Sequence, residues 1–329
     1  MMGPLSGNLS AFTSLSRHLP EIRADLERAA HETVTGRRQD LSLTLGGRAG
    51  EFALIEKGLA DLETNTSRLG LTEGRLRQTG LVLTSVRDAF APMTERALTD
   101  LSLNEPAART ETAAAARATL DQVISLLNTN ESGRHLFAGD ETEGPALADA
   151  ETLLTAAQAA LTGATTIADQ EAAFDAFFNG AGFDTLVYQG GPGQAAAAAL
   201  GDGSAVRFEA KADAQPVRDL LNGLARLALA PGLPEGGAAW AGTAAEKLAA
   251  ANDGMILMQS VNGVAEGRVS RALEAQGQER LVLTATQQSL AGVDTVEAAS
   301  RVKSLELQLE AAYAMTARLS RLNFADYIR

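Results

Sequence analysis

The side chains best suited to chemistry do not form a recognisable catalytic or metal-binding pattern in this sequence. His31 and Glu32 open a zincin-like H-E-x-x-H motif, but position 35 is a threonine instead of the second histidine. The other two histidines, His18 and His135, lie far away in the chain. Cysteine is absent, which removes disulfides, thiolate nucleophiles and cysteine-based zinc sites together. We therefore expect no catalytic residue, no metal site and no enzymatic activity.

One segment imitates a dinucleotide-binding loop. Gly191, Gly193 and Ala196 match the pattern G-x-G-x-x-A, and Glu209 lies at roughly the distance of a ribose-binding acid. A Rossmann unit needs a crossover helix after these glycines, but a second glycine turn at 201–203 follows too soon. We interpret the segment as a turn and expect no bound cofactor and no small-molecule substrate.

The charge balance limits the classes of partner. The chain has 28 basic and 41 acidic residues, a net charge of -13, whereas phosphate recognition needs clustered Lys and Arg. Residues 1–20 have no basic region followed by an apolar run, and no later window has the length of a membrane span. We expect no nucleic-acid and no membrane partner, and either a cytoplasmic location or export without a cleavable signal peptide.

A seven-residue repeat gives the clearest structural signal. Hydrophobic residues make up 45% of the 329 residues but aromatic residues only 4%, a composition that suits narrow seams between helices. An apolar column between about residues 48 and 103 follows a coiled-coil register. Its members are Ile55, Leu62, Leu69, Leu76, Leu83, Phe90 and Ala97. Pro106 is placed to begin a second helix that ends near residue 130.

Both ends of the chain are amphipathic and have no obvious partner nearby in sequence. Pro20 lies inside the N-terminal pattern and should kink or divide that helix. Asp294 is placed to cap the last helix. The two stripes should pair with each other or with neighbouring subunits. Their members are Leu5, Leu9, Phe12, Leu19, Ile22, Leu26 and Ala29 at one end, and Val302, Leu305, Leu309, Ala312, Met315, Thr316 and Leu319 at the other.

The middle of the chain has a different sequence pattern, which predicts short helices and strand-like runs at 183–189 and 205–211. The sequence thus predicts a mainly α fold, in which the N- and C-terminal halves form a long antiparallel helical rod or coiled coil with a small inserted α+β outer domain. The expected domains are terminal helices (1–45 and 295–329), a rod (46–143 and 238–294) and an outer insert (144–237).

Acidic charge follows the same division. Residues 140–253 contain sixteen acidic and five basic residues, whereas residues 1–40 contain five of each. Nearly neutral amphipathic ends suit packing inside an assembly, and an acidic insert suits its solvated outside. An ordinary acidic surface would give the same numbers.

Three local motifs give the chain a resemblance to the flagellin superfamily. Residues 133–139, Gly-Arg-His-Leu-Phe-Ala-Gly, are similar to a segment of the hook-filament junction proteins of the hook-associated protein 3 type. Residues 305–329 are similar to the terminal helix of flagellins and junction proteins, and residues 35–38 occupy the place of an S/T-G-K/R turn. The Asp-Asp-Pro-like segment of filament flagellins is not recognisable in residues 39–50, which favours the junction proteins.

The resemblance implies a structural component of the flagellum, exported without a cleavable signal peptide and located outside the cell. It implies self-assembly into a ring, with the hook-side junction protein, filament flagellin and an export chaperone as partners. The predicted assembly interface comprises Leu5, Leu9, Phe12, Ile22, Leu26, Val302, Leu305, Leu309, Met315 and Leu319. Filament flagellin, a cytoplasmic coiled-coil scaffold, an enzyme with its site in the insert, and a monomer with an intramolecular coiled coil are the alternatives.

Overall fold

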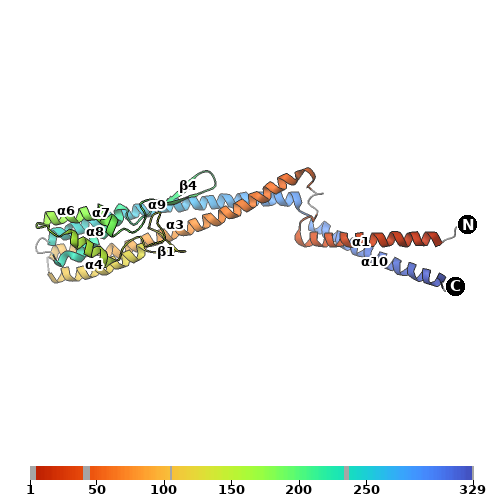
Figure 1. Ribbon diagram of the computed structural model, residues 1–329, viewed down its shortest axis with the longest axis horizontal. Helices are drawn as coiled ribbons and strands as arrows, with labels where there is room; N and C mark the ends of the chain where they lie inside the picture. The colour runs from red at the N-terminus through yellow and green to blue at the C-terminus, as the bar shows by residue number, and fades with distance from the viewer. Residues whose placement is uncertain (1–4, 40–44, 104–105, 233–236, 328–329) are drawn as a thin grey trace. The chain divides into compact units, whose positions relative to one another are not determined.

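The computed structural model describes residues 5–39, 45–103, 106–232 and 237–327 (Figure 1). Its contacts divide the chain into two units, which we call unit 1 (residues 1–64 and 276–329) and unit 2 (residues 65–275). The helices are α1 (Leu5–Thr35), α3 (Ala49–Leu103), α4 (Pro106–Leu127), α5 (Ala150–Ala160), α6 (Ile167–Phe178), α7 (Ala181–Leu186), α8 (Gln215–Leu229), α9 (Gly237–Ala291) and α10 (Thr295–Tyr327), with short 3-10 turns η1 (Gly46–Arg48) and η2 (Ala230–Gly232). The strands are β1 (Asn130–Glu131), β2 (Arg134–His135), β3 (Ala195–Ala199) and β4 (Ala205–Phe208).

The predicted fold class is confirmed. Helices α3 and α9 contain 55 residues each and pass through both units, and the strands form only two small antiparallel pairs. Within unit 2, Arg87 Nη1 donates to Gln259 Oε1 at 3.0 Å, while Leu76 accepts a hydrogen bond from Asn262. Later residues of α3 therefore meet earlier residues of α9, which makes the two helices antiparallel.

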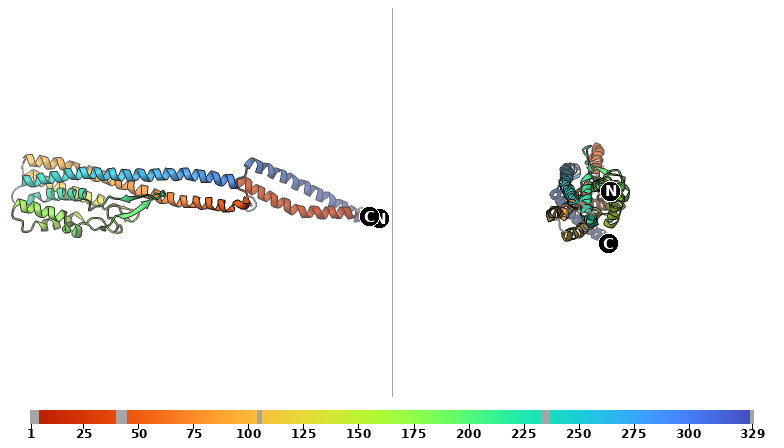
Figure 2. Two further views of the ribbon diagram at one scale, coloured as in Figure 1. Left: turned by 90° about the horizontal axis from the view of Figure 1, so that it is seen from above. Right: turned by 90° about the vertical axis from the view of Figure 1, so that its left-hand side faces the viewer.

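Unit 1 contains two antiparallel helix pairs, α1 with α10 and the start of α3 with the end of α9 (Figures 1 and 2). Phe52 and Ile55 of α3 pack against Leu290 and Ala291 of α9 in a small apolar cluster. Helix α1 runs through Pro20 without being divided, contrary to one of our two expectations. The proline is exposed, so the backbone carbonyl that it leaves unbonded can be solvated.

Unit 2 has one continuous apolar core. Residues of α3, α4 and α9 form it together with residues from the middle of the chain, and these elements lie together in Figure 1. Aromatic side chains are few in this chain, and most of them lie in this core, including its single tryptophan, Trp240. Phe174 and Trp240 are fully buried and meet edge to face, with ring centroids 5.1 Å apart. Alanines and leucines fill most of the remaining core, as the composition predicted.

A buried arginine is held in this core. Arg226 is fully buried, and its Nη2 donates to Asp175 Oδ1 at 3.0 Å while its Nε donates to Asn222 Oδ1 at 2.7 Å. Its guanidinium lies 4.4 Å from the ring centroid of Trp240. Burial opposes the charge of Asp175, but hydrogen bonding from Asn222 and the positive charge of Arg226 outweigh it and lower the pKa of that carboxyl.

The strand prediction is correct in one place and wrong in another. Residues 205–208 form β4, which pairs with β3 through a register irregularity between Ala195 and Ala198. Residues 183–186, predicted as a strand, belong to helix α7 instead. A helix places Phe183 and Val187, four residues apart, together in the core, where both are fully buried. In place of a strand, Tyr188 forms an isolated β-bridge with Leu147.

The segment 133–139 begins at a tight hairpin and ends against the glycine-rich turn. Ser132 and Gly133 have positive φ values of 52° and 82°, and they connect β1 to β2 through the two-residue turn that favours this conformation. Gly139 also has a positive φ of 66°, and a Cβ there would lie 2.6 Å from the carbonyl oxygen of Gly191 and 2.7 Å from that of Gly193. The last glycine of the segment is therefore required by close backbone approach.

The same contact explains the nucleotide-binding imitation at 191–196. The backbone N–H of Gly193 donates to Asp140 Oδ1 at 2.8 Å, and the Tyr188 hydroxyl donates to the Gly191 carbonyl at 2.9 Å. The backbone N–H that a phosphate would need is therefore already bonded to a carboxylate of the same chain. Residues 195–199 form β3 and supply no crossover helix.

We predict that Gly139→Ala lowers the free energy of unfolding of unit 2 by about 2 kcal/mol or more, because it combines backbone strain with a steric clash. Trp240 fluorescence during urea unfolding reports this change, since the ring is fully buried in unit 2. Gly133→Ala is the matched control. It shares the positive φ, but no atom lies within 4 Å of its Cβ position, so only the strain of about 1 kcal/mol remains. Equal losses in the two variants would contradict this account.

We also predict that acid weakens unit 2 through Asp175. A carboxyl with a lowered folded-state pKa stabilises the fold above its unfolded pKa, and this stabilisation is lost as pH falls through the folded value. Asp175→Asn should therefore reduce the fall in unfolding free energy between about pH 5 and pH 3. At pH 7 it should cost about 1–2 kcal/mol, less than for a fully buried pair, because the carboxylate is 40% exposed.

The measurement is urea unfolding followed by Trp240 fluorescence across this pH range. Asp253→Asn serves as the control, because Asp253 is an exposed carboxylate of the same unit on α9. The control should keep the original pH dependence, and a pH dependence unchanged in Asp175→Asn would show that Asp175 is not its source.

Candidate assembly interface

The predicted interface lies on α1 and α10, which pack against each other as an antiparallel pair in unit 1. Small side chains allow the approach: Ala29 of α1 and Ala312 of α10 are 2% and 7% exposed. Leu305 is also buried, at 9%. Because the buried positions of α10 are spaced by seven residues, its stripe faces its partner in the same chain.

The predicted interface residues fall into three groups. Buried or half-buried on the paired helices are Ile22, Leu26, Val302, Leu305 and Leu309. Met315 is 58% exposed and lies outside the contact between the two helices. The structure places Leu5, Leu9 and Phe12 on α1 and Leu319 on α10, but their side chains lie outside its description. A role of these ten residues in assembly stays a prediction.

An arginine and a tyrosine join the two helices at a point that sequence reasoning missed. Arg23 Nε donates to the Tyr313 hydroxyl at 2.8 Å, and the guanidinium lies 5.5 Å from the ring centroid. The available signal was a tyrosine in the middle of a helix otherwise rich in alanine, leucine and glutamate. The pair joins residues 290 positions apart and so favours one register of the two helices.

The turn at residues 35–38 fastens α1 to the junction of α9 and α10. Gly36 adopts a positive φ of 66° after α1, and its carbonyl accepts a hydrogen bond from Val293 N at 3.0 Å. Arg37 forms an isolated antiparallel bridge with Gly292, and Arg37 Nη2 donates to Gln287 Oε1 at 2.9 Å. The turn motif therefore has a structural role, because its hydrogen bonds fix the segment between α9 and α10.

Asp294 caps α10 as predicted. Its Oδ1 accepts hydrogen bonds from Val296 N at 2.8 Å and from Glu297 N at 3.3 Å.

All six residues predicted for the rod seam are buried. Ile55 and Leu62 are each 7% exposed in unit 1, and the other four are between 0% and 1% exposed in unit 2. In unit 2 the seam continues into a cluster of Leu69 and Leu76 with Val269 of α9. The four seam residues that lie in unit 2 are Leu69, Leu76, Leu83 and Phe90.

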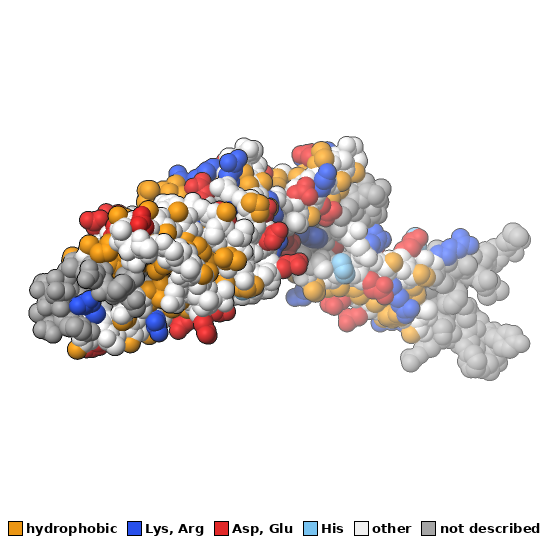
Figure 3. Space-filling view, turned by 60° about the vertical axis from the view of Figure 1, so that its left-hand side comes forward, with side chains coloured by type: hydrophobic (Ala, Val, Ile, Leu, Met, Phe, Trp, Pro, Cys, Tyr) orange, Lys and Arg blue, Asp and Glu red, His pale blue; other side chains and the backbone are white. Residues whose placement is uncertain are grey.

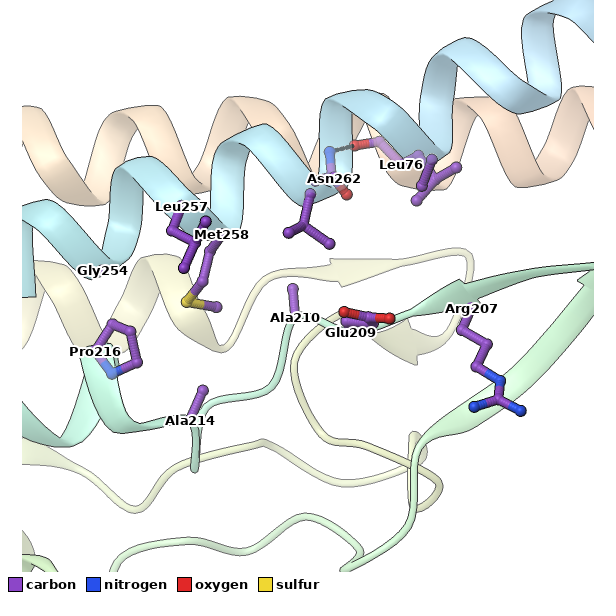
Figure 4. Close-up of a pocket in the computed structure, with 12 residues that line it drawn as sticks. Leu76, Arg207, Glu209, Ala210, Ala214, Pro216, Gly254, Leu257, Met258 and Asn262 are labelled. Carbon is purple, nitrogen blue, oxygen red and sulfur yellow. Dashed lines mark hydrogen bonds between the residues drawn. The ribbon is translucent and has the colours of Figure 1, made fainter.

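A buried asparagine breaks the apolar seam. Asn262 of α9 is 8% exposed, and its Nδ2 donates to the Leu76 carbonyl at 2.8 Å (Figure 4). A Cβ on Gly80 would lie 3.2 Å from the same nitrogen, so the glycine makes room for the amide. A buried polar residue in such a seam favours the register in which the facing helix offers both an acceptor and room for the amide, as Leu76 and Gly80 do here.

The pocket beside this asparagine is apolar. It has a volume of about 250 Å³ and lies between α9, the start of α8 and the end of β4 (Figure 4). Leu257, Met258 and Val261 line it from α9, while Arg207 and Glu209 are its charged lining residues. The arrangement can accommodate an apolar side chain.

Within the described parts of the chain, no group of three or more His, Cys, Asp or Glu side chains is placed to hold a metal ion. None of the helices that the structure describes is both long and apolar enough to cross a membrane. On the face shown in Figure 3, acidic and basic side chains are interspersed. His135 has a structural contact, because its Nδ1 lies 2.8 Å from the Asn128 carbonyl at the end of α4.

Comparison with known proteins places these features in a family context. Residues 246–328, which include α10 and most of α9, match the family model of the bacterial flagellin C-terminal helical region. The fold is similar to that of Bacillus cereus FlgL, with a TM-score of 0.53 and 17% identity over 71% of this chain and 99% of that one.

A putative flagellar hook-associated protein from Vibrio parahaemolyticus is similar with a TM-score of 0.58 and 13% identity, over 74% of this chain and 98% of that one. A search of curated protein sequences finds no match. The chain thus has a fold similar to that of these two flagellar proteins, and its resemblance to flagellins is confirmed for the C-terminal helical region at residues 246–328.

Proposed function

We propose that this protein is a structural component of the bacterial flagellum, located outside the cell, and that it acts as an adaptor at the junction between hook and filament. The observation that carries the proposal is the pair formed by α1 and α10, whose C-terminal partner lies in the flagellin-like region. The two similar structures reported above belong to proteins described as FlgL or as a putative hook-associated protein. The role is mechanical and needs no catalytic residue.

In this proposal the terminal helices form the inner layer of a ring of copies, the middle of α3 and α9 forms the rod layer, and residues 144–237 lie outside. The acidic character of residues 140–253, sixteen acids against five bases, suits a solvated outer layer. The hook-side junction protein and filament flagellin would contact the two faces of the ring. An export chaperone would hold the terminal helices before assembly, because isolated amphipathic helices are marginal in water.

Met315 supports an interface beyond the intramolecular pair. It is 58% exposed, and Leu307 on the same helix is 60% exposed, so α10 keeps apolar surface after pairing with α1. A contiguous exposed apolar patch is typical of a surface that contacts another chain, and these two side chains would contribute to such a patch. The monomer shown here therefore still has apolar surface on α10 that assembly could bury.

We predict that deletion of the gene leaves bare hooks and releases flagellin into the medium, because filament subunits would have no adaptor on which to assemble. Electron microscopy of cells and immunoblotting of the culture medium measure the two effects, and expression from a plasmid should restore filaments. Loss of the filament without released flagellin would indicate a filament flagellin instead. Intact filaments with normal motility would reject the junction role and favour a scaffold elsewhere.

We further predict that Met315→Gln impairs filament attachment while changing the unfolding free energy by no more than about 0.5 kcal/mol, because the side chain is exposed in the monomer. Motility and electron microscopy measure the first effect, and urea unfolding measures the second. Leu186→Gln is the control, since Leu186 is 53% exposed but lies on α7 in unit 2. Leu186→Gln should leave attachment intact, and an equal defect in both variants would mean that Met315 has no special role.

A further inference from the structure

Unit 2 contains a second cleft, of about 350 Å³, that differs in character from the apolar pocket on α9. Its walls come from α3, the β1–β2 hairpin and the β3–β4 ribbon. Three arginines line it, Arg68, Arg75 and Arg134, and Glu131 is its one acidic lining residue. The cleft is therefore basic on a chain whose net charge is -13.

Two of the arginines are fixed by contacts that do not neutralise them. Arg68 Nη2 donates to the Ala199 carbonyl at 2.9 Å, which ties α3 to the end of β3. The Arg75 guanidinium lies 4.3 Å from the ring centroid of Phe208 on β4. Neither a carbonyl nor an aromatic ring carries a full negative charge, so the positive charges remain.

Arg75 also has unused hydrogen-bonding capacity. Among the described residues, no acceptor contacts its Nε or its Nη2, although both atoms are buried. Burial, then the positive charge of Arg134, lowers the pKa of Arg75, while Glu131 opposes this change. A buried donor without an acceptor is costly, and a guanidinium is shaped to bind the two oxygens of a carboxylate. Arg75 is therefore placed to gain from an incoming anion.

Arg134 is presented by a rigid support. It follows the two-residue turn of Ser132 and Gly133, and its backbone pairs directly with Glu131 on β1. Ser132 holds a positive φ of 52°, which side-chain-bearing residues rarely adopt. The side chain itself is exposed. Because the hairpin already fixes the backbone at this position, only the arginine side chain has to be ordered when a partner binds.

We propose that this cleft binds a carboxylate side chain of a second copy of this chain. The inference deepens the proposed assembly role and rests on it, since it names one contact through which copies associate. Charge complementarity carries the choice of occupant, because every copy offers sixteen acidic residues between 140 and 253. Ala196, Ala197 and Ala198 line the same cleft, and these uncharged residues suit a side chain on a peptide better than a fully hydrated ion.

The test introduces a single reactive amine into the cleft. Arg134→Lys keeps the positive charge, and a zero-length carbodiimide then joins that amine to any carboxylate in direct contact. Equal amounts of 14N- and 15N-labelled full-length chain are mixed, so that mass spectrometry separates crosslinks between copies from crosslinks within one copy. Lys211 and Asp213, 2.9 Å apart, provide an internal positive control within each copy.

We expect crosslinks between copies from position 134 to acidic residues in 140–253, several-fold more than from the matched variant Arg117→Lys, an exposed position on α4. The yield should fall as salt is raised, because exposed ion pairs are screened. Trp240 fluorescence verifies that both variants fold.

Three results would overturn the proposal. One is crosslinking from position 134 only to Glu131 of the same copy, and another is equal yield from positions 134 and 117. The third is thermal protection by citrate without crosslinks between copies, which would assign the cleft to free anions. Because the experiment uses purified chain, its failure is distinguishable from failure of the junction role, which gene deletion judges in cells.

Discussion

The antiparallel packing of α3 against α9 is the contact on which the other features depend. An apolar column at every seventh position of α3 must be covered along its length, and the helix from the other half of the chain covers it. The chain must therefore return antiparallel to its own path. Asn262 then favours one register by donating to the Leu76 carbonyl inside the seam.

Each unit uses this packing for a different purpose. In unit 1 the ends of α3 and α9 support the turn at Gly36 and the cap at Asp294, which together determine where α10 begins. In unit 2 the same two helices provide one side of a core completed by α4 to α8, with Arg226 and Trp240 in its interior. Helices α1 and α10 thus lie in the unit with the smaller apolar cluster, and the larger core lies in the other unit.

In the proposed contact, the acidic surface of one copy is complementary in charge to the basic cleft of another copy. A net charge of -13 keeps single copies soluble and apart, and the three arginines beside β1 and β3 concentrate positive charge where another copy could approach. Specific charge pairs of this kind select orientation and partner more than they add affinity. In the proposed assembly, burial of the apolar surface left on α10 would contribute binding free energy, while the charge pairs would determine how the copies are oriented.

The sequence by itself determined the features that follow from periodicity and local chemistry. The seven-residue column, the helix start at Pro106 and the cap at Asp294 depend on neighbours within a few residues, and all three are present. Tertiary structure alone decided the rest. Residues 183–186 became helical because burial of Phe183 outweighed their strand propensity, and Gly139 meets Gly191 only after folding.

The sites differ in the same way. The apolar stripes of α1 and α10 were visible as a pattern, because one helix face repeats along the sequence. Arg68, Arg75 and Arg134 are ordinary surface residues in sequence, separated by up to 66 positions, and only the folded chain brings them into one cleft. No local pattern records such a cluster, because its members belong to different elements that meet through long-range packing.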